Sequence, residues 1–170
     1  MAGGGKAPVA ALLEELKLWL RIEDTGEDAL LHQLLHAATG AAEAILGWLL
    51  IAREVEERGR LSAGVLRLTA TPVRELLSVV RQEDGAPVEA VLKNGSVGPA
   101  LVQASVMRAD VRVTFVAGEA ADWNGLDEMI RLAVIRLAGH FYAHRDGRED
   151  PGIPPAVTRM LEPFRGRRLI

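Results

Sequence analysis

The sequence predicts an α+β protein in which a helical body carries an inserted antiparallel β module. Apolar residues recur at helical spacing near both ends of the 170-residue chain. Between them, short apolar runs are broken by turn residues, which is typical of antiparallel strands. We therefore expect residues 8–48 and 119–162 to form the helical body and residues 49–118 the β module, with a disordered start (1–7) and a C-terminal docking tail (163–170).

Two helices are expected in the first part of the helical body. The first begins near Pro8, since a first helical turn does not need the N–H that proline lacks. Its predicted buried side contains Leu12, Leu13, Leu16, Trp19 and Leu20, and its polar side Glu14, Glu15, Lys17 and Arg21. Thr25 is predicted to cap the second helix, whose acidic first turn suits the helix dipole, and Gly47 to end it. The predicted apolar stripe of this helix is Leu30, Leu31, Leu34, Leu35, Ala38, Ala42 and Ile45.

A third helix is expected to open at Asn124 and to run to about His144, with Asp127 placed to complement its first turn. Its predicted buried stripe is Leu126, Ile130, Ala133, Val134, Leu137 and Phe141, widened by Met129, Ile135 and Tyr142. Pro155 can start a last short helix, which is too short to be stable alone and must dock on a neighbour. Val157, Met160, Leu161 and Phe164 share one face of it.

Six segments of the middle third are predicted to be strands of one small antiparallel sheet with one solvated face. Residues 110–116 alternate polar and apolar side chains most clearly. Hairpin turns are indicated by Asp84-Gly85 and Asn94-Gly95, because these pairs adopt the backbone angles of tight turns. The predicted strands are residues 50–56, 65–68, 75–82, 88–92, 100–107 and 110–117.

The composition excludes several classes of protein. Cysteine is absent, so no disulfide framework, cysteine metal site or thiol nucleophile can form. A formal net charge of −3 gives no overall attraction to nucleic acid. No run reaches the roughly 18 to 20 apolar residues of a membrane span, and the start lacks the apolar stretch of a secretory signal. We expect a soluble, unexported protein that does not associate with membranes.

The sequence holds no motif that indicates catalysis. It lacks a phosphate-binding loop, a nucleophile elbow and a dinucleotide-binding glycine pattern, so no catalytic residue and no cofactor is predicted. Six charged residues close together in the sequence are interpreted as a solvated cluster at a strand end rather than as a set of catalytic carboxylates. It consists of Glu54, Glu56 and Glu57 with Arg53, Arg58 and Arg60.

Particular residues of the sequence suggest two other functions, a metal site and DNA binding. His32 with His36, and His140 with His144, are four residues apart on predicted helices and could hold a transition metal. However, Gln33 stands where a metalloprotease needs its catalytic glutamate, and we predict no metal site. A small DNA-binding regulator with a helix-turn-helix is disfavoured because the acidic loop of residues 23–28 would face the phosphates.

The last six residues are basic and apolar. Arg165, Arg167 and Arg168 gather beside Leu169 and Ile170. A frayed, solubilising tail is one interpretation. The other is a docking arm, since arginine forks and a terminal aliphatic pair suit insertion into a partner's groove.

The order of motifs along the chain resembles the head-tail connector (adaptor) family of tailed phages and phage-derived gene-transfer particles. That family joins a short helix with a Lys-x-x-Leu-Arg core, an acidic loop and a long Ala-rich helix, matched here by residues 17–24 (KLWLRIED) and 37–43 (AATGAAE). Thr71-Pro72-Val73 supplies a proline before a strand, and Val116-Ala117-Gly118 closes the sheet. The C-terminal motif corresponds to residues 139–146 (GHFYAHRD) followed by 154–165 (PPAVTRMLEPFR).

This resemblance implies a non-enzymatic virion protein located in the neck of a particle and assembled in the host cytoplasm. It implies a homo-oligomeric, dodecameric ring that binds the portal protein on one side and a tail-side stopper or tail terminator protein on the other, with DNA only as passing cargo. The C-terminal tail is expected to reach into the portal. The implied portal-binding residues are Phe164, Arg165, Arg167, Arg168, Leu169 and Ile170.

Overall fold

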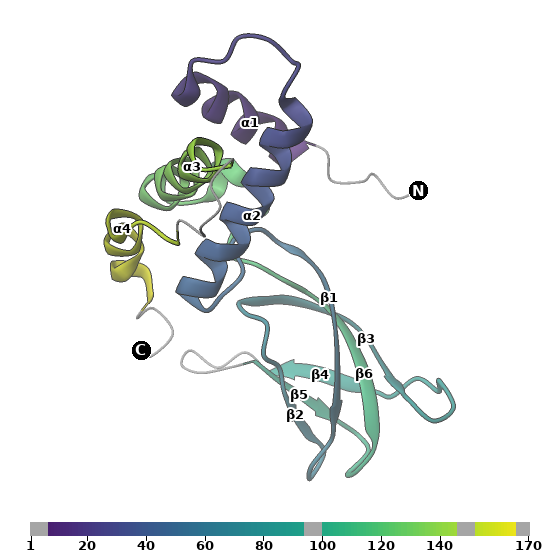
Figure 1. Cartoon of the computed structure of the whole chain (residues 1–170). Helices are drawn as coiled ribbons and strands as arrows, with labels where there is room; N and C mark the ends of the chain where they lie inside the picture. The colour runs from purple at the N-terminus through teal and green to yellow at the C-terminus, as the bar shows by residue number, and fades with distance from the viewer. Residues whose placement is uncertain (1–6, 94–99, 146–151, 166–170) are drawn as a thin grey trace. The chain divides into compact units, whose positions relative to one another are not determined.

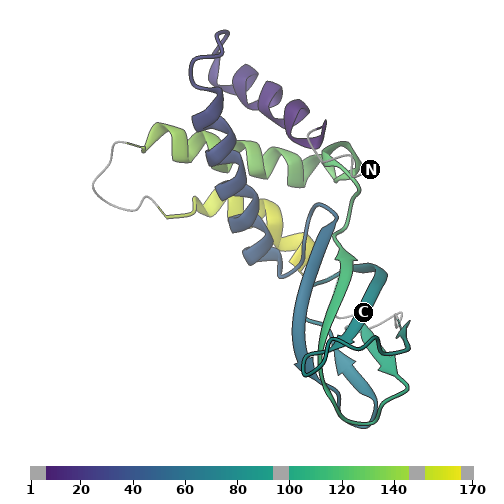
Figure 2. The same cartoon turned by 90° about the vertical axis from the view of Figure 1, so that its right-hand side faces the viewer.

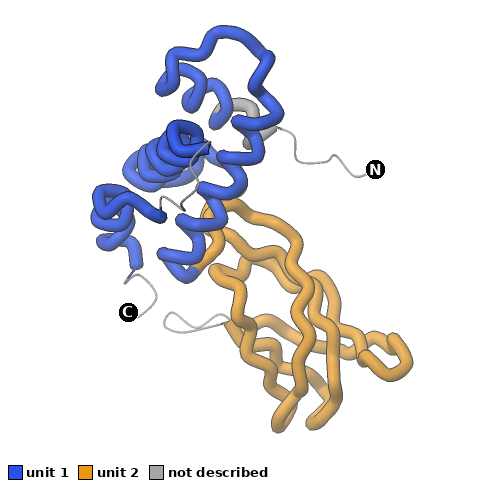
Figure 3. The backbone as a smooth tube through the Cα atoms, viewed as in Figure 1, with its two compact units in different colours: residues 1–47, 122–166 blue, residues 48–121, 167–170 orange. Residues whose placement is uncertain are grey.

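The computed structural model describes residues 7–93, 100–145 and 152–165. The chain divides into two compact units (Figure 3). Among the described residues, those up to Gly47 and from Asp122 onward form a helical unit, and those from Trp48 to Ala121 form a β unit. Helices and antiparallel strands are thus both present, and the predicted α+β class is confirmed.

The described residues of the helical unit form four α-helices and one short 3₁₀ helix. In chain order these are α1 (Ala7–Leu20), α2 (Asp28–Leu46), η1 (Trp123–Gly125), α3 (Glu128–Ala143) and α4 (Pro155–Arg165). Figures 1 and 2 show that α3 lies between α1 and α4, while α2 crosses all three. Among the described helices, none combines the length and the apolar character that crossing a membrane requires.

The helix ends follow local chemistry, with two differences from expectation. Gly47 ends α2 in the left-handed region at φ 78°, and its N–H donates to the Glu43 carbonyl at 2.8 Å, as predicted. Thr25 does not cap α2. The N-cap is Glu27, which makes no side-chain cap hydrogen bond. Asn124 does not open α3 either, because Asp127 is the N-cap and its carboxylate accepts from the Met129 N–H at 2.9 Å.

Large aliphatic side chains form the core of the helical unit. Leu16 of α1, Leu31 and Leu35 of α2, Leu137 of α3 and Leu161 of α4 are almost fully buried. Each helix therefore contributes an apolar side to one shared interior, which stabilises helices that are too short to persist alone.

Where the structure describes the β unit, it forms six strands in two three-stranded antiparallel sheets. The strands are β1 (Arg53–Arg60), β2 (Val65–Arg67), β3 (Val73–Arg81), β4 (Ala90–Lys93), β5 (Leu101–Ala104) and β6 (Asp110–Ala117). Their spatial orders are β1-β6-β3 and β2-β5-β4. The expectation of a single sheet was therefore wrong, although each predicted strand segment overlaps an observed strand. The first strand begins three residues later than expected, at Arg53.

β6 is the central strand of its sheet and contributes more buried side chains to the core of the β unit than any other described strand. Its residues alternate as predicted, with Val111, Val113, Phe115 and Ala117 buried. Arg112, on the other side of the strand, is exposed. The buried side chains pack with residues of both sheets, such as Leu61, Leu68 and Val102. One face of the β1-β6-β3 sheet is thus in the core and the other is in solvent.

Gly118 closes the sheet after β6 by a close approach of two backbone segments. Its φ is +145°, a conformation that favours glycine, and a Cβ at this position would lie 2.4 Å from the Ala52 nitrogen. The Ala-Gly pair at the end of β6 therefore has a steric cause.

Candidate functional site

Helix α4 positions the start of the predicted docking tail. The Pro154 carbonyl accepts hydrogen bonds from the N–H groups of Val157 and Thr158 at 2.9 and 3.3 Å, which forms the first turn. Val157, Leu161 and Phe164 are buried against the helical unit. The helix is held by this apolar side, and its other side faces solvent.

The structure describes two of the six predicted portal-binding residues and places them in different environments. Phe164 is buried on the inner side of α4 and retains only 9% of its exposure. Arg165, the last described residue, is exposed. The remaining four, Arg167, Arg168, Leu169 and Ile170, lie outside the described residues. In the isolated chain, Phe164 therefore belongs to the apolar interior and Arg165 to the surface.

An open hollow of about 500 Å³ lies between α1 and α3. Leu18, Trp19 and Leu132 line it and are 79%, 51% and 40% exposed. Trp19 was expected in the core of the helical unit, and this expectation was wrong. Its indole edge instead faces the bare backbone of Gly139, where an added Cβ would lie 3.1 Å from the Trp19 Nε1.

Polar contacts fix α1 to the other helices around this hollow. Lys17 was expected on the solvent side of α1, but it is buried, and its Nζ donates to the Asp28 carboxylate at 2.8 Å. That hydrogen bond raises the pKa of the Lys17 ammonium above its usual 10.5. Arg131 of α3 forms an ion pair with Glu15 of α1. The geometry of the hollow is therefore set by ionic contacts between helices as well as by packing.

Tyr142, near the end of α3, is linked to the start of α2. Its hydroxyl donates a hydrogen bond to the Glu27 carboxylate, which raises the pKa of the Tyr142 hydroxyl above 10.0. The Arg145 guanidinium lies 4.2 Å from the centre of the same ring. Tyr142 was predicted to widen the buried stripe, and the structure shows that it also makes a polar contact with α2.

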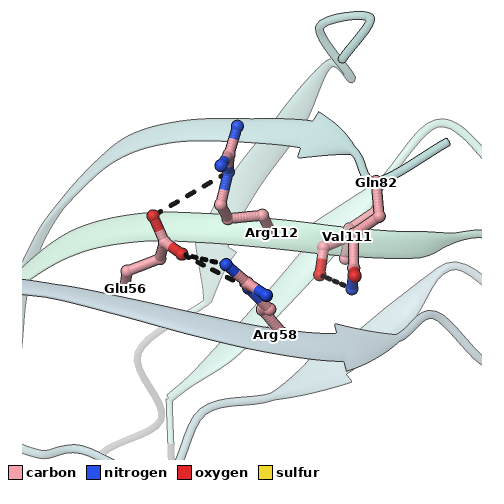
Figure 4. A network of polar contacts seen from close by, with 5 residues as sticks. All are labelled: Glu56, Arg58, Gln82, Val111 and Arg112. Atoms are coloured by element: carbon pink, nitrogen blue, oxygen red, sulfur yellow. Dashed lines mark hydrogen bonds and ion pairs between the residues drawn. The ribbon is translucent and has the colours of Figure 1, made fainter. Parts of the chain in front are cut away.

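The charged cluster of the β unit lies along β1, and its described contacts stabilise the sheet. Figure 4 shows Glu56 between Arg58 and Arg112, at 3.4 and 3.8 Å. Arg58 and Arg112 are directly opposite in the β1–β6 register, so the carboxylate offsets a repulsion between like charges.

Glu57 binds the strand connection that precedes β3. Its carboxylate accepts from the Thr69 hydroxyl at 2.7 Å and from the Ala70 N–H at 2.7 Å. These hydrogen bonds satisfy polar groups of a segment that lies outside the strands. A separate hollow of about 810 Å³, lined in part by Arg60, Arg81 and Arg108, is open to solvent.

The two histidine pairs do not converge. His32 and His36 lie on α2, whereas the rings of His140 and His144 lie 4.2 Å apart at the end of α3. The His144 Nδ1 is 2.8 Å from the His140 carbonyl oxygen, which occupies that nitrogen. Within the described ranges, no three His, Asp or Glu side chains are grouped so that they could hold a metal ion.

Comparison with known proteins connects this architecture to particle necks. The profile of the family described as phage gp6-like head-tail connector protein matches residues 10–71. No curated protein sequence matches the chain significantly.

Solved structures match over nearly the whole chain. A chain of a native gene transfer agent (GTA) virion is 25% identical with a TM-score of 0.70, covering 97% of this chain and 92% of that one. A chain from the neck of an empty GTA particle, computed with C6 symmetry, is 23% identical with a TM-score of 0.71, covering 95% and 92%. A chain from the neck of a native GTA particle, computed with C12 symmetry, is 24% identical with a TM-score of 0.67, covering 97% and 92%. The resemblance is therefore confirmed: residues 10–71 carry the pattern of the phage head-tail connector family, and the fold is that of GTA neck chains.

Proposed function

We propose that this chain is the adaptor subunit of a phage-type particle neck. Copies of it form a ring that binds the portal on one side and a stopper or tail terminator protein on the other, and DNA passes through the ring. The role is assembly, without catalysis or a bound cofactor.

The match to GTA neck and virion chains is the observation that carries this proposal. The likeness covers both the helical unit and the β unit, so it is not confined to a common helical motif. Two of the similar chains belong to necks computed with C6 and C12 symmetry, which supports a ring of identical subunits. The connector-family match over residues 10–71, which include most of α1 together with α2, β1 and β2, points to the same class independently.

The C-terminal tail is the proposed portal contact. Its first three residues, 163–165, form the end of α4, where Phe164 is buried against the helical unit and Arg165 is exposed. Arginine forks bind carboxylates in two-pronged geometry, and Leu169 and Ile170 add an apolar end. One short tail binds weakly, but several tails in a ring that engage one portal ring gain avidity.

A truncation ending at Arg165 tests this assignment. Removing the whole predicted tail, 163–170, would also remove Phe164 from the interior. A loss of portal capture could then result from a loss of folding. The truncated chain is expected to keep the unfolding curve of the full chain and to lose capture by the cognate portal in pull-down. Deletion of residues 1–6 is the matched control and should leave capture intact.

Electron microscopy of particle necks tests the ring itself. The full chain is expected in a closed ring next to the portal, with twelvefold repetition as in the similar GTA neck. A full-length, folded chain that neither binds the portal nor occurs in the neck would refute the proposed function.

A further inference from the structure

One end of the β unit gathers arginine side chains from separate segments of the chain. β1 and β3 end there and β6 begins there, because β6 is the antiparallel neighbour of both strands. The chain enters the β unit before β1 and leaves it after β6, so the other end of these strands holds both links to the helical unit. The open hollow of about 810 Å³ lies at the arginine-rich end. Four of its lining residues carry guanidinium groups, namely Arg58, Arg60, Arg81 and Arg108.

The hollow carries more positive than negative charge. Its four arginines are accompanied by two described lining carboxylates, Glu83 and Asp110. Arg108, in the connection between β5 and β6, is exposed and forms no ion pair with any described residue. This local excess exists although the whole chain has a formal net charge of −3. Because a cleft lined by one sign of charge concentrates ions of the opposite sign, the hollow is expected to attract anions.

The ion pairs that these arginines form are long and exposed. The Arg60 Nε is 3.9 Å from the Asp110 carboxylate, and the Arg81 Nη2 is 3.4 Å from the Asp84 carboxylate. Both distances exceed the roughly 2.7–2.9 Å of a charge-assisted hydrogen bond. The four side chains keep between 43% and 76% of their exposure. Such pairs contribute little free energy, so the guanidinium groups can exchange these partners for a stronger anion.

The lining favours a nucleic-acid backbone over an acidic protein surface. Seven of the ten described lining residues are polar or charged, and the aliphatic ones are only Val106 and Ala109. Protein–protein interfaces have an apolar core enriched in aromatic residues, whereas protein–DNA interfaces are polar and strongly positive. No aromatic side chain is among the described lining residues, so unpaired bases would find no stacking surface there. The lining therefore suits the phosphate oxygens of a duplex, which arginine forks bind in two-pronged geometry.

We propose that this hollow is a contact site for the phosphates of the duplex DNA that passes through the ring. The inference rests on the proposed function, since that function brings DNA to the subunit. Contact is expected to be independent of base sequence, because guanidinium groups that bind phosphates do not read base edges. Each copy contributes a weak contact, and weak phosphate contacts let DNA slide. A ring of such contacts can therefore hold DNA without blocking its passage.

Neutralising two of the arginines tests the site. Arg60→Gln/Arg108→Gln removes two positive charges at exposed positions and keeps polar side chains there. Fluorescence polarisation of a short labelled duplex is measured with the full chain between about 50 and 200 mM salt. The double variant should bind at least about tenfold more weakly at the lowest salt, and the slope of log affinity against log salt should become shallower by about two. Arg67→Gln/Lys93→Gln, at exposed positions of β2 and β4 outside the hollow, is the matched control and should keep the natural affinity.

Neutralising a carboxylate of the hollow should have the opposite effect. Asp110→Asn removes the counter-charge of Arg60 and is expected to strengthen duplex binding roughly two- to fivefold, the equivalent of one exposed ion pair. Glu75→Gln, at an exposed position of β3 outside the hollow, changes the net charge equally and should leave the affinity unchanged. A gain confined to Asp110→Asn cannot arise from damage to the fold. Circular dichroism verifies that every variant remains folded.

A photo-cross-linker in the hollow tests the contact in assembled particles. Because the natural chain contains no cysteine, Glu83→Cys can be labelled with an azidophenyl maleimide before assembly, while all four arginines of the hollow remain. Illumination of filled particles is expected to link this position to DNA. Glu75→Cys replaces a glutamate outside the hollow in the same way and should give no DNA adduct.

The outcomes separate this inference from the proposed function. Portal capture by a natural chain whose duplex affinity is absent, or is unchanged in Arg60→Gln/Arg108→Gln, would overturn the assigned site and leave the adaptor role intact. Cross-links from Glu83→Cys to a neck protein instead of DNA would also overturn it, since a protein would then cover the hollow. Absence of portal capture by the natural chain would instead refute the adaptor role, and the polarisation measurements would still decide whether the hollow binds phosphates.

Discussion

Replacing Phe164 by alanine should lower the stability of the helical unit. The effect should not be limited to partner binding. The side chain is on the inner side of α4 and is 9% exposed, so truncation removes a buried ring and leaves a cavity. Phe→Ala substitutions at buried positions cost roughly 3–5 kcal/mol, and the position near the helix end favours the lower value, about 3 kcal/mol. At ordinary urea dependence this lowers the unfolding midpoint by roughly 1 to 3 M.

The assay is urea unfolding, monitored by the helical circular dichroism signal. This signal reports on the helical unit, which contains every described α-helix. Phe164→Leu is the matched control. It keeps most of the apolar volume and should cost less than about 1.5 kcal/mol. If Phe164→Ala unfolds at the same urea concentration as the natural chain, the Phe164 side chain does not hold α4 against the helical unit in solution. The argument that separates Phe164 from the rest of the tail would then fail.

Three further predictions concern stability. Gly40→Ala should stabilise the chain by about 1 kcal/mol in urea unfolding, because Gly40 is exposed within α2 and an added Cβ meets nothing within 4 Å; a loss of stability would contradict this. Gly118→Ala should cost about 3 kcal/mol or more in the same assay, because its φ is +145° and the Cβ would collide with Ala52, and a neutral result would exclude that backbone geometry. Stability should also fall above about pH 10, because the folded state raises the pKa of Lys17 and Tyr142 and so holds their protons more tightly than the unfolded chain. Urea midpoints between pH 8 and 11 check this, and the Lys17→Met/Tyr142→Phe chain should show a flatter decline.

Much of the fold could be predicted because its signals are local. The period-two alternation of residues 110–116 corresponds to β6, and Gly47 ends α2 with the expected left-handed turn. Val73 begins β3 directly after the proline that indicated a strand. Each of these features depends on residues within a few positions of one another.

Features that depend on distant residues were missed. The six strands were predicted as one sheet, because pairing partners such as β2 and β5 are separated by more than 30 residues and local alternation does not specify them. Lys17 was placed on the solvent side because its partner, Asp28, lies on the next helix. Glu27 was assigned only to an acidic first turn, although its carboxylate binds Tyr142 of α3.

The same limit explains why the candidate surfaces were harder to predict than the fold. Leu18, Trp19 and Leu20 are consecutive in α1, so helical periodicity cannot decide which of them faces the interior. The structure leaves Leu18 and Trp19 half or more exposed beside Leu132, a residue more than 110 positions later in the chain. A subunit that works by repeated contact has no catalytic motif to find, since its specificity lies in surfaces that exist only after folding. The apolar excess of α1 was nevertheless present in the sequence: three successive large apolar residues on a short helix exceed what one buried stripe requires, and such an excess indicates a second partner.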